Sequence, residues 1–236
     1  MKADGFDSPT GHFPINIWEN YTSEMYELMG IKSGDQILEI GCGSGAFLYP
    51  LYLQNINVTG VDYSKELIDI AKKFFKNSNF YFSDALDYVN SETRLYNFVL
   101  SHGVFLYFPD INYSEKVLNR MIDLSKDKVV VMDICDSDKE DLYKKDRIEK
   151  YQEQGLSEEE YEKKYSGLNH LFFEKDWFIN FAKKRNLKIK IFDQKCKEYY
   201  NSKYRFNVIL EHWLKSINES FDSGCWIWEK DEANYF

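Results

Sequence analysis

The sequence carries little positive charge for its length. Its 236 residues include 30 lysines and arginines against 39 aspartates and glutamates, a formal net charge of −9 at pH 7. Nucleic-acid binding depends on cationic side chains that release counterions, so this balance argues against a nucleic-acid substrate. One candidate basic cluster, Lys183, Lys184 and Arg185, is interpreted as the solvated end of a helix, where cations are favoured.

Cysteine and long apolar runs are also scarce. The four cysteines lie far apart and form no C-x-x-C pair, which is typical of a reduced protein of the cytosol. No apolar run approaches the ~18–20 residues that span a bilayer. The first 13 residues have no apolar core of a secretory signal. We therefore expect a cytoplasmic protein with no membrane association.

Glycine and proline are too few, at 12 and 4, for a fibrous or low-complexity protein. Hydrophobic residues make up 44% of the chain and aromatic residues 17%, which is ample for a buried core. The length suggests one large domain or one domain with an insert. We expect a single domain over residues 1–236.

Short apolar segments alternate with helical segments through the first ~135 residues, which predicts a parallel sheet with right-handed crossovers. Ligands of such sheets bind at the carboxyl ends of the strands. The predicted strands are residues 36–40, 57–62, 79–85, 96–103 and 128–136.

The chain departs from this alternation after the fifth predicted strand. A highly charged stretch, 136–165, reads as one or two exposed helices with a break near Gly155, and two more strands follow it. The expected parts are an N-terminal helical cap (1–34), a lid or insert (136–172), late strands (187–194 and 205–210) and an aromatic tail (211–236).

A glycine-rich loop in the stretch LEIGCGSGAF follows the first predicted strand. It is not a phosphate-binding P-loop, because no lysine follows the glycines. Residues Gly41 to Ala46 do satisfy G-x-G-x-x-[G/A], and Asp62 lies about 20 residues further on. A dinucleotide therefore remains one candidate ligand.

Three details favour S-adenosylmethionine instead. Glu39 stands two residues before the first glycine, where a carboxylate would repel a pyrophosphate and attract an ammonium group. Gly45 extends the run to Gly-x-Gly-x-Gly, which leaves the loop backbone open to a flat, uncharged sugar. Asp84 ends the third predicted strand, where it could accept a hydrogen bond from an adenine amino group.

At these residues the sequence resembles the class I S-adenosylmethionine-dependent methyltransferases, over residues 36–136. EIGCGSG, VTGVDYS and FYFSDALDY match the first three motifs of that family in the right order. The resemblance implies a three-layer, Rossmann-like α/β fold with a seven-stranded, mostly parallel sheet and an antiparallel last strand. It also implies S-adenosyl-L-methionine as cofactor and S-adenosyl-L-homocysteine as product.

The resemblance further implies roles for the residues of the first and second motifs. Glu39, Gly41 and Gly43 would line the methionine and ribose parts of the cofactor. Asp62 would bind both ribose hydroxyls.

The third motif and the fourth strand would hold the rest of the cofactor. Tyr63 would flank the adenine, and Asp84 would accept from its amino group with Ala85 beside it. Ser101 and His102 would border the methionine part and the reacting methyl group. The alternative for the two aspartates of these motifs is that they only cap the helices that follow.

Methyl transfer is an in-line displacement in which the protein mainly aligns the acceptor, and a hydroxyl acceptor also benefits from a general base, usually histidine. The two catalytic candidates are His102, after the fourth strand, and His170, which follows the charged insert. His12 could fold over the cofactor, and His212 is expected to be structural. The acceptor-pocket candidates are Tyr21, Tyr107, His170, Tyr204 and Arg205.

Sequence features of several methyltransferase subclasses are missing: the [DN]-P-P-[YF] sequence, a Pro–Cys nucleophile, the C-x-x-x-C-x-x-C radical motif and a two-glutamate hairpin. The acidic set of magnesium-dependent enzymes is not evident, although Asp133 and Asp136 leave it open. We predict a metal-free enzyme, a monomer or homodimer, that methylates a small molecule, at oxygen in preference to nitrogen. The alternatives are an NAD(P)-dependent oxidoreductase and a non-catalytic subunit of the same fold.

Overall fold

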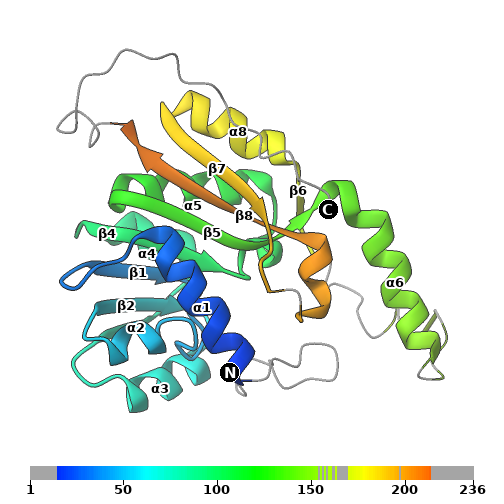
Figure 1. Ribbon diagram of the computed structural model, residues 1–236, viewed down its shortest axis with the longest axis horizontal. Helices are drawn as coiled ribbons and strands as arrows, with labels where there is room; N and C mark the ends of the chain where they lie inside the picture. Colours follow the sequence, from blue (N-terminus) through cyan, green and yellow to red (C-terminus); the bar gives the residue numbers. More distant parts are fainter. Residues whose placement is uncertain are drawn as a thin grey trace.

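The computed structural model describes residues 15–153, 155, 157, 159–160, 163, 170–196 and 198–213. In this part of the chain, helices lie on both faces of a twisted central sheet (Figure 1). The strands run in the order β3-β2-β1-β4-β5-β8-β7, and β6 pairs with β5 outside this path. The strand bounds are β1 Gln36–Ile40, β2 Asn57–Asp62, β3 Asn79–Phe82, β4 Tyr96–His102, β5 Ser125–Asp136, β6 Phe172–Phe173, β7 Leu187–Asp193 and β8 Arg205–His212.

Strand directions agree with the predicted architecture. β1 to β5 pair in parallel, and β8 is antiparallel to both β5 and β7. The centre of β5 is uncharged and fully enclosed from Val129 to Met132, as a parallel strand covered on both faces must be. The mostly parallel sheet and the antiparallel last strand are therefore confirmed.

Each face of the sheet is covered by its own set of helices and its own apolar cluster. On one side α1 (Ile15–Met29), α2 (Tyr49–Leu53) and α3 (Lys65–Phe74) contribute residues such as Trp18, Leu51 and Ile68. On the other side lie α4 (Ala85–Ser91), α5 (Ile111–Leu124) and α8 (Lys175–Lys184). Apolar residues at helical spacing produce these faces.

Three strands differ clearly from the sequence prediction. β5 begins at Ser125, three residues before its predicted start at Lys128. The third strand ends at Phe82, three residues early, because Asp84 begins α4 as its N-cap. A two-residue strand, β6, joins β5 and raises the sheet from seven to eight strands. Two residues are too short to show a strand period in sequence.

The insert after β5 contains α6 (Glu140–Glu153), which extends from the body of the molecule in Figure 1. Gly155 follows with φ of +78°, a left-handed conformation that ends helices and fits the predicted break. Residues 1–14 of the predicted cap, His12 among them, and residues 214–236 of the predicted tail lie outside the described residues.

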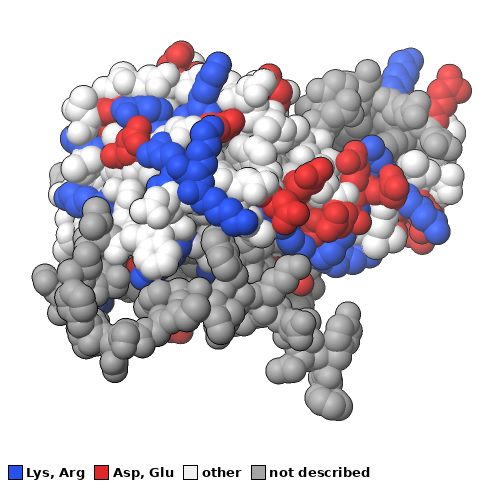
Figure 2. All heavy atoms as spheres, turned by 90° about the horizontal axis from the view of Figure 1, so that it is seen from above, with Lys and Arg blue, Asp and Glu red and all other residues white. Residues whose placement is uncertain are grey.

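The basic cluster at the end of α8 packs against acidic residues of α5. Lys184 pairs with Glu115 at 2.9 Å and Arg185 with Asp123 at 2.7 Å. In Figure 2, blue and red side chains lie next to one another, and the described residues on that face form no unbroken basic surface. The predicted position of this cluster at a helix end is confirmed.

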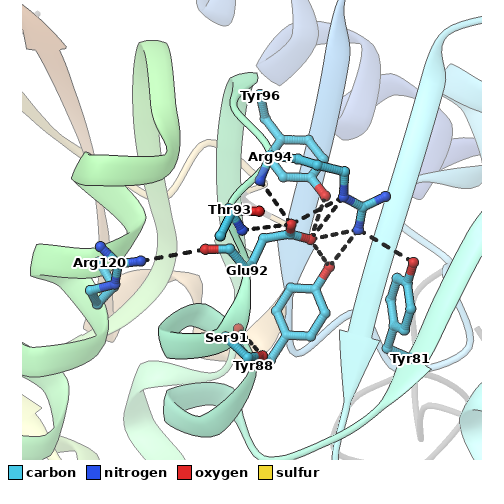
Figure 3. Close-up of polar contacts among 8 residues, drawn as sticks. All are labelled: Tyr81, Tyr88, Ser91, Glu92, Thr93, Arg94, Tyr96 and Arg120. Atoms are coloured by element: carbon cyan, nitrogen blue, oxygen red, sulfur yellow. Dashed lines mark hydrogen bonds and ion pairs between the residues drawn. The ribbon is translucent and has the colours of Figure 1, made fainter.

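A buried carboxylate ties the end of α4 to the beginning of β4 (Figure 3). Glu92 accepts hydrogen bonds from the hydroxyls of Tyr88 (2.7 Å) and Tyr96 (3.0 Å) and from the Arg94 guanidinium (2.5 Å). Burial opposes ionisation of Glu92, but these donors and the Arg94 backbone outweigh it and hold its pKa well below the usual range. This cluster stabilises the end of the sheet opposite to the strand ends that form the site.

Candidate active site

A cavity of about 650 Å³ lies at the carboxyl ends of the parallel strands, where this type of sheet binds ligands. The residues that follow β1 to β5 supply much of its wall. These predicted site residues line it: Glu39, Gly41, Gly43, Asp62, Tyr63, Asp84, Ala85, His102, Tyr107, His170 and Arg205.

The glycine loop is fixed by backbone conformation and by a carboxylate. Gly41 has φ of +75°, and a Cβ there would stand 2.3 Å from the side chain of Val104. Asp62 accepts hydrogen bonds from the backbone N–H of Gly43 and of Ser64, both at 2.8 Å. Ser64, not Asp62, is the N-cap of α3. The Asp62 carboxylate therefore joins the loop after β1 to the end of β2.

Asp84 does cap a helix, as the alternative interpretation held. Its Oδ1 accepts from the backbone N–H of Leu86 at 2.8 Å and of Asp87 at 3.2 Å. The Tyr113 hydroxyl donates to both Asp84 oxygens at 2.8 Å, and burial together with this carboxylate raises the pKa of Tyr113 to about 12. Asp84 nevertheless lines the cavity. The hydrogen bonds by which it caps α4 therefore also hold its carboxylate in place at the cavity wall.

Two predicted site residues and one glycine lie behind the cavity wall. Ser101 is fully buried, and its hydroxyl donates to the carbonyl of Ile40 at 3.0 Å, inside the sheet. Tyr21 is buried, and its hydroxyl lies 3.2 Å from Nε2 of His102, which does line the cavity. A Cβ on Gly45 would meet the ring of Phe75 at 2.6 Å. Close packing, not an open approach for a sugar, therefore requires this glycine.

His102 is enclosed by aromatic rings. The Phe47 ring stacks on it with centroids 5.1 Å apart, and the Trp18 ring meets it edge-on at 5.5 Å. Its Nε2 lies 3.2 Å from the Tyr21 hydroxyl. Burial lowers the pKa of His102, so the imidazole is neutral at physiological pH. Helix α1 thus holds this side chain from behind.

His170 is positioned by the insert. Its Nδ1 lies 2.9 Å from the hydroxyl of Tyr143 on α6, and the Tyr107 ring meets it edge-on at 5.3 Å. Arg147, one turn along α6, hydrogen-bonds to the same tyrosine oxygen. Burial and the nearby Arg147 charge lower the pKa of His170 to about 4. His170 is therefore a neutral imidazole at neutral pH, and Tyr143 of the insert contacts it through Nδ1.

Arg205, the first residue of β8, lines the cavity and is 2% exposed. In the sheet, β4 and β5 separate β8 from β1, the strand before the glycine loop. Its Nε stands 3.9 Å from Oδ1 of Asp133. Asp133 has φ of +59° at an irregularity in the pairing of β5 with β8. Gln194 donates to Asp133 Oδ1 at 3.2 Å, and the Asp133 N–H donates to Asn207 at 3.0 Å.

Sequence reasoning assigned no role to several residues of the wall. Aromatic rings in α1 and α5, just after the glycine loop and in the segment before β8 were not distinguishable from core residues, and polar groups in loops carry no period. These wall residues are Trp18, Phe47, Tyr113, Tyr199 and Asn201. Tyr204, a further candidate, is buried behind the wall and hydrogen-bonds to Asp146. His212 ends β8.

No group of three His, Cys, Asp or Glu side chains in the described residues could hold a metal ion. Asp136, one of the two aspartates for which the sequence left a magnesium site open, is buried and forms an ion pair with Lys175 at 2.8 Å. No helix in the described part of the chain is long and apolar enough to cross a membrane.

A model of the methyltransferase domain family matches residues 31–200, most of the chain. The protein therefore belongs to the methyltransferase domain family, and the family predicted from the three motifs is confirmed. Among the predicted cofactor, catalytic and acceptor-pocket residues, the match leaves out Tyr21, Tyr204 and Arg205, which lie before residue 31 or after residue 200.

One of the curated relatives agrees with this assignment. A candidate methyltransferase of Geobacillus sp. (strain WCH70) is 28% identical over 67 residues, which are 28% of this chain and 27% of that protein. The chain aligns with only 20% and 27% of the lengths of the two curated relatives that it matches.

Solved structures share the fold. Magnesium protoporphyrin IX methyltransferase from Synechocystis PCC 6803, with bound SAH, aligns with a TM-score of 0.59 at 14% identity, over 84% of this chain and 82% of that one. The plantazolicin methyltransferase BpumL, in complex with a pentazolic desmethylPZN analog and SAH, gives 0.58 at 20% identity over 89% and 88%. At identities of 14% and 20%, these alignments show a shared fold and nothing more specific.

Proposed function

We propose that the protein is an S-adenosyl-L-methionine-dependent methyltransferase. The observation that carries this proposal is the charge of the cavity wall near the glycine loop. Glu39, Asp62 and Asp84 line it, and Arg205 is the only lysine or arginine among the described residues of the wall. A pyrophosphate would face three carboxylates there, whereas a sulfonium and an ammonium group would be attracted.

The residues of the wall fit such a cofactor by their chemistry. The Asp62 carboxylate already accepts two backbone N–H groups and has further acceptor capacity for ribose hydroxyls. Glu39, Gly41 and Gly43 would hold the methionine and ribose parts, and Tyr63, Asp84 and Ala85 the adenine. When bound, S-adenosyl-L-methionine supplies the electrophilic methyl group.

The acceptor is proposed to be a small molecule that is methylated at oxygen, with nitrogen as the second choice. His170 would act as the general base. It is neutral at physiological pH, and a proton on Nδ1, shared with Tyr143, would leave Nε2 as its acceptor atom. His102 is a weaker candidate because its Nε2 already faces the Tyr21 hydroxyl.

We further propose that residues 1–236 form a single domain, with 136–172 as a lid over the acceptor. In support of this division, α6 of the insert supplies the contact of Tyr143 with His170.

Thermal unfolding with S-adenosyl-L-homocysteine or NADH tests the cofactor. We expect stabilisation by S-adenosyl-L-homocysteine that grows with its concentration by mass action and no stabilisation by NADH. Stabilisation by NADH alone would establish the oxidoreductase alternative instead. Binding of S-adenosyl-L-homocysteine without release of product from any small-molecule acceptor would favour the non-catalytic subunit.

A further inference from the structure

Arg205 is an unusual buried cation. Its side chain is 2% exposed, yet its Nε and Nη1 have no hydrogen-bond partner within the described part of the chain. Buried guanidinium groups are normally held by several acceptors, because an uncompensated buried charge is strongly destabilising. The side chain faces the cavity, so the missing acceptor can come from a ligand there.

The carboxylate of Asp133 does not supply the hydrogen-bond acceptor that Arg205 lacks. Asp133 Oδ1 lies 3.9 Å from the Arg205 Nε, which gives attraction but not a hydrogen bond. That oxygen already accepts from Gln194, and the backbone of Asp133 is held by Asn207 at a bulge. Asp133 therefore offsets part of the arginine charge and leaves its donors available.

The part of the cavity beside Arg205 combines a guanidinium group with aromatic rings. The Tyr107 phenol and His170 line it together with Tyr199. Partial desolvation raises the pKa of Tyr107, the charge of Arg205 lowers it, that of Asp133 raises it and that of Arg147 lowers it, so the Arg205–Asp133 pair acts on this region. The cavity thus has three carboxylates near the glycine loop and, at β8, the Arg205 guanidinium with Asp133 beside it.

We propose that the methyl acceptor is an organic acid with an aromatic body, and that Arg205 binds its carboxylate. This proposal specifies the acceptor of the proposed methyltransferase and rests on that proposed function. A single negative charge fits better than a phosphate dianion, because Asp133 stands beside the guanidinium and would repel a second charge. The rings of Tyr107, His170 and Tyr199 would contact the aromatic body.

Ligand-observed NMR with the S-adenosyl-L-homocysteine-saturated protein tests this proposal. The probes are benzoate, its neutral isostere benzamide, and inorganic phosphate. We expect benzoate to bind and the other two to bind about tenfold more weakly or not at all, the discrimination expected of a charge-assisted contact. Equal binding of benzoate and benzamide, or no binding of benzoate, would overturn the proposal. Binding of phosphate alone would replace the carboxylate with a phosphate ligand.

Arg205→Met should weaken benzoate binding about tenfold or more and leave benzamide unchanged, and Arg205→Lys should restore part of the affinity. Affinity for S-adenosyl-L-homocysteine is the control for folding in both variants. Unchanged benzoate affinity in a folded Arg205→Met protein would contradict the assignment.

Asp133→Asn provides a second test that keeps Arg205 intact. Asparagine tolerates the left-handed backbone of this position, and loss of the competing charge should tighten benzoate binding several-fold. Weaker or unchanged binding would count against Arg205 as the carboxylate site. Failure of the wild type to bind S-adenosyl-L-homocysteine would instead overturn the proposed function, whatever benzoate does.

Discussion

Asp62 and Gly43 are joined by a hydrogen bond of 2.8 Å between the carboxylate at the end of β2 and the backbone N–H of the glycine loop. The second carboxylate oxygen accepts from Ser64. One side chain therefore fixes the turns after two neighbouring strands. The shape of the glycine loop therefore depends on the Asp62 carboxylate.

Asp62→Ala should weaken binding of S-adenosyl-L-homocysteine by about 1–3 kcal/mol, the range for loss of a charged hydrogen-bond partner. Isothermal titration calorimetry measures the change. Asp69→Ala is the matched control, since Asp69 is an exposed aspartate of α3 that pairs with Lys65. An affinity equal to wild type in Asp62→Ala would remove Asp62 from the cofactor site.

Much of the cofactor half of the site, around the glycine loop and Asp62, could be predicted from the sequence. β1 and β2 begin and end at the predicted residues, because short apolar runs stand directly before glycine and aspartate. Ser101 shows the limit of that reasoning. Successive side chains of a strand point to opposite faces, so Ser101 lies inside the sheet while its neighbour His102 lines the cavity.

The acceptor half was less predictable because it depends on contacts between distant segments. Asp133 reaches Arg205 only because β5 has an irregular register opposite β8 and Asp133 takes a positive φ. His170 depends on Tyr143, 27 residues earlier in a highly charged helix of the insert. Composition and periodicity contain no signal for either contact.

His170→Ala should lower kcat by about 10²–10⁴-fold, the usual contribution of a general base, and leave affinity for S-adenosyl-L-homocysteine close to wild type. Release of S-adenosyl-L-homocysteine with an accepted substrate measures kcat, and calorimetry measures affinity. Tyr143→Phe retains the ring but loses the 2.9 Å contact with Nδ1, so a smaller loss is expected. A collapse of cofactor affinity in His170→Ala would mean that the insert does not serve the acceptor.

The pKa of His170, lowered to about 4 by burial and then by Arg147, gives a pH prediction. The base is neutral above this pKa, so kcat should be constant from neutral pH down to about pH 5 and fall as His170 gains a proton. Arg147→Met removes a positive charge and should move this fall to higher pH. An NMR titration of the imidazole follows the pKa directly, and no upward shift in Arg147→Met would contradict the electrostatic explanation.

Glu92→Gln tests the carboxylate cluster of Figure 3, away from the cavity. The variant should lose about 1–3 kcal/mol of unfolding free energy at pH 7, because a buried charged acceptor of several hydrogen bonds becomes neutral. The folded pKa of Glu92 is depressed, so its contribution is complete above the unfolded pKa of about 4.3. It is lost as pH falls below that value.

The difference between wild type and Glu92→Gln should therefore shrink in acid. Urea unfolding at pH 7 and near pH 3.5, a point chosen below the ordinary pKa of about 4.3 for glutamate, measures it. Glu27→Gln, an exposed change on α1, is the control and should stay within about 0.5 kcal/mol of wild type. A Glu92→Gln difference that is the same at both pH values would show that the cluster stabilises the fold by packing and not by the charge of Glu92.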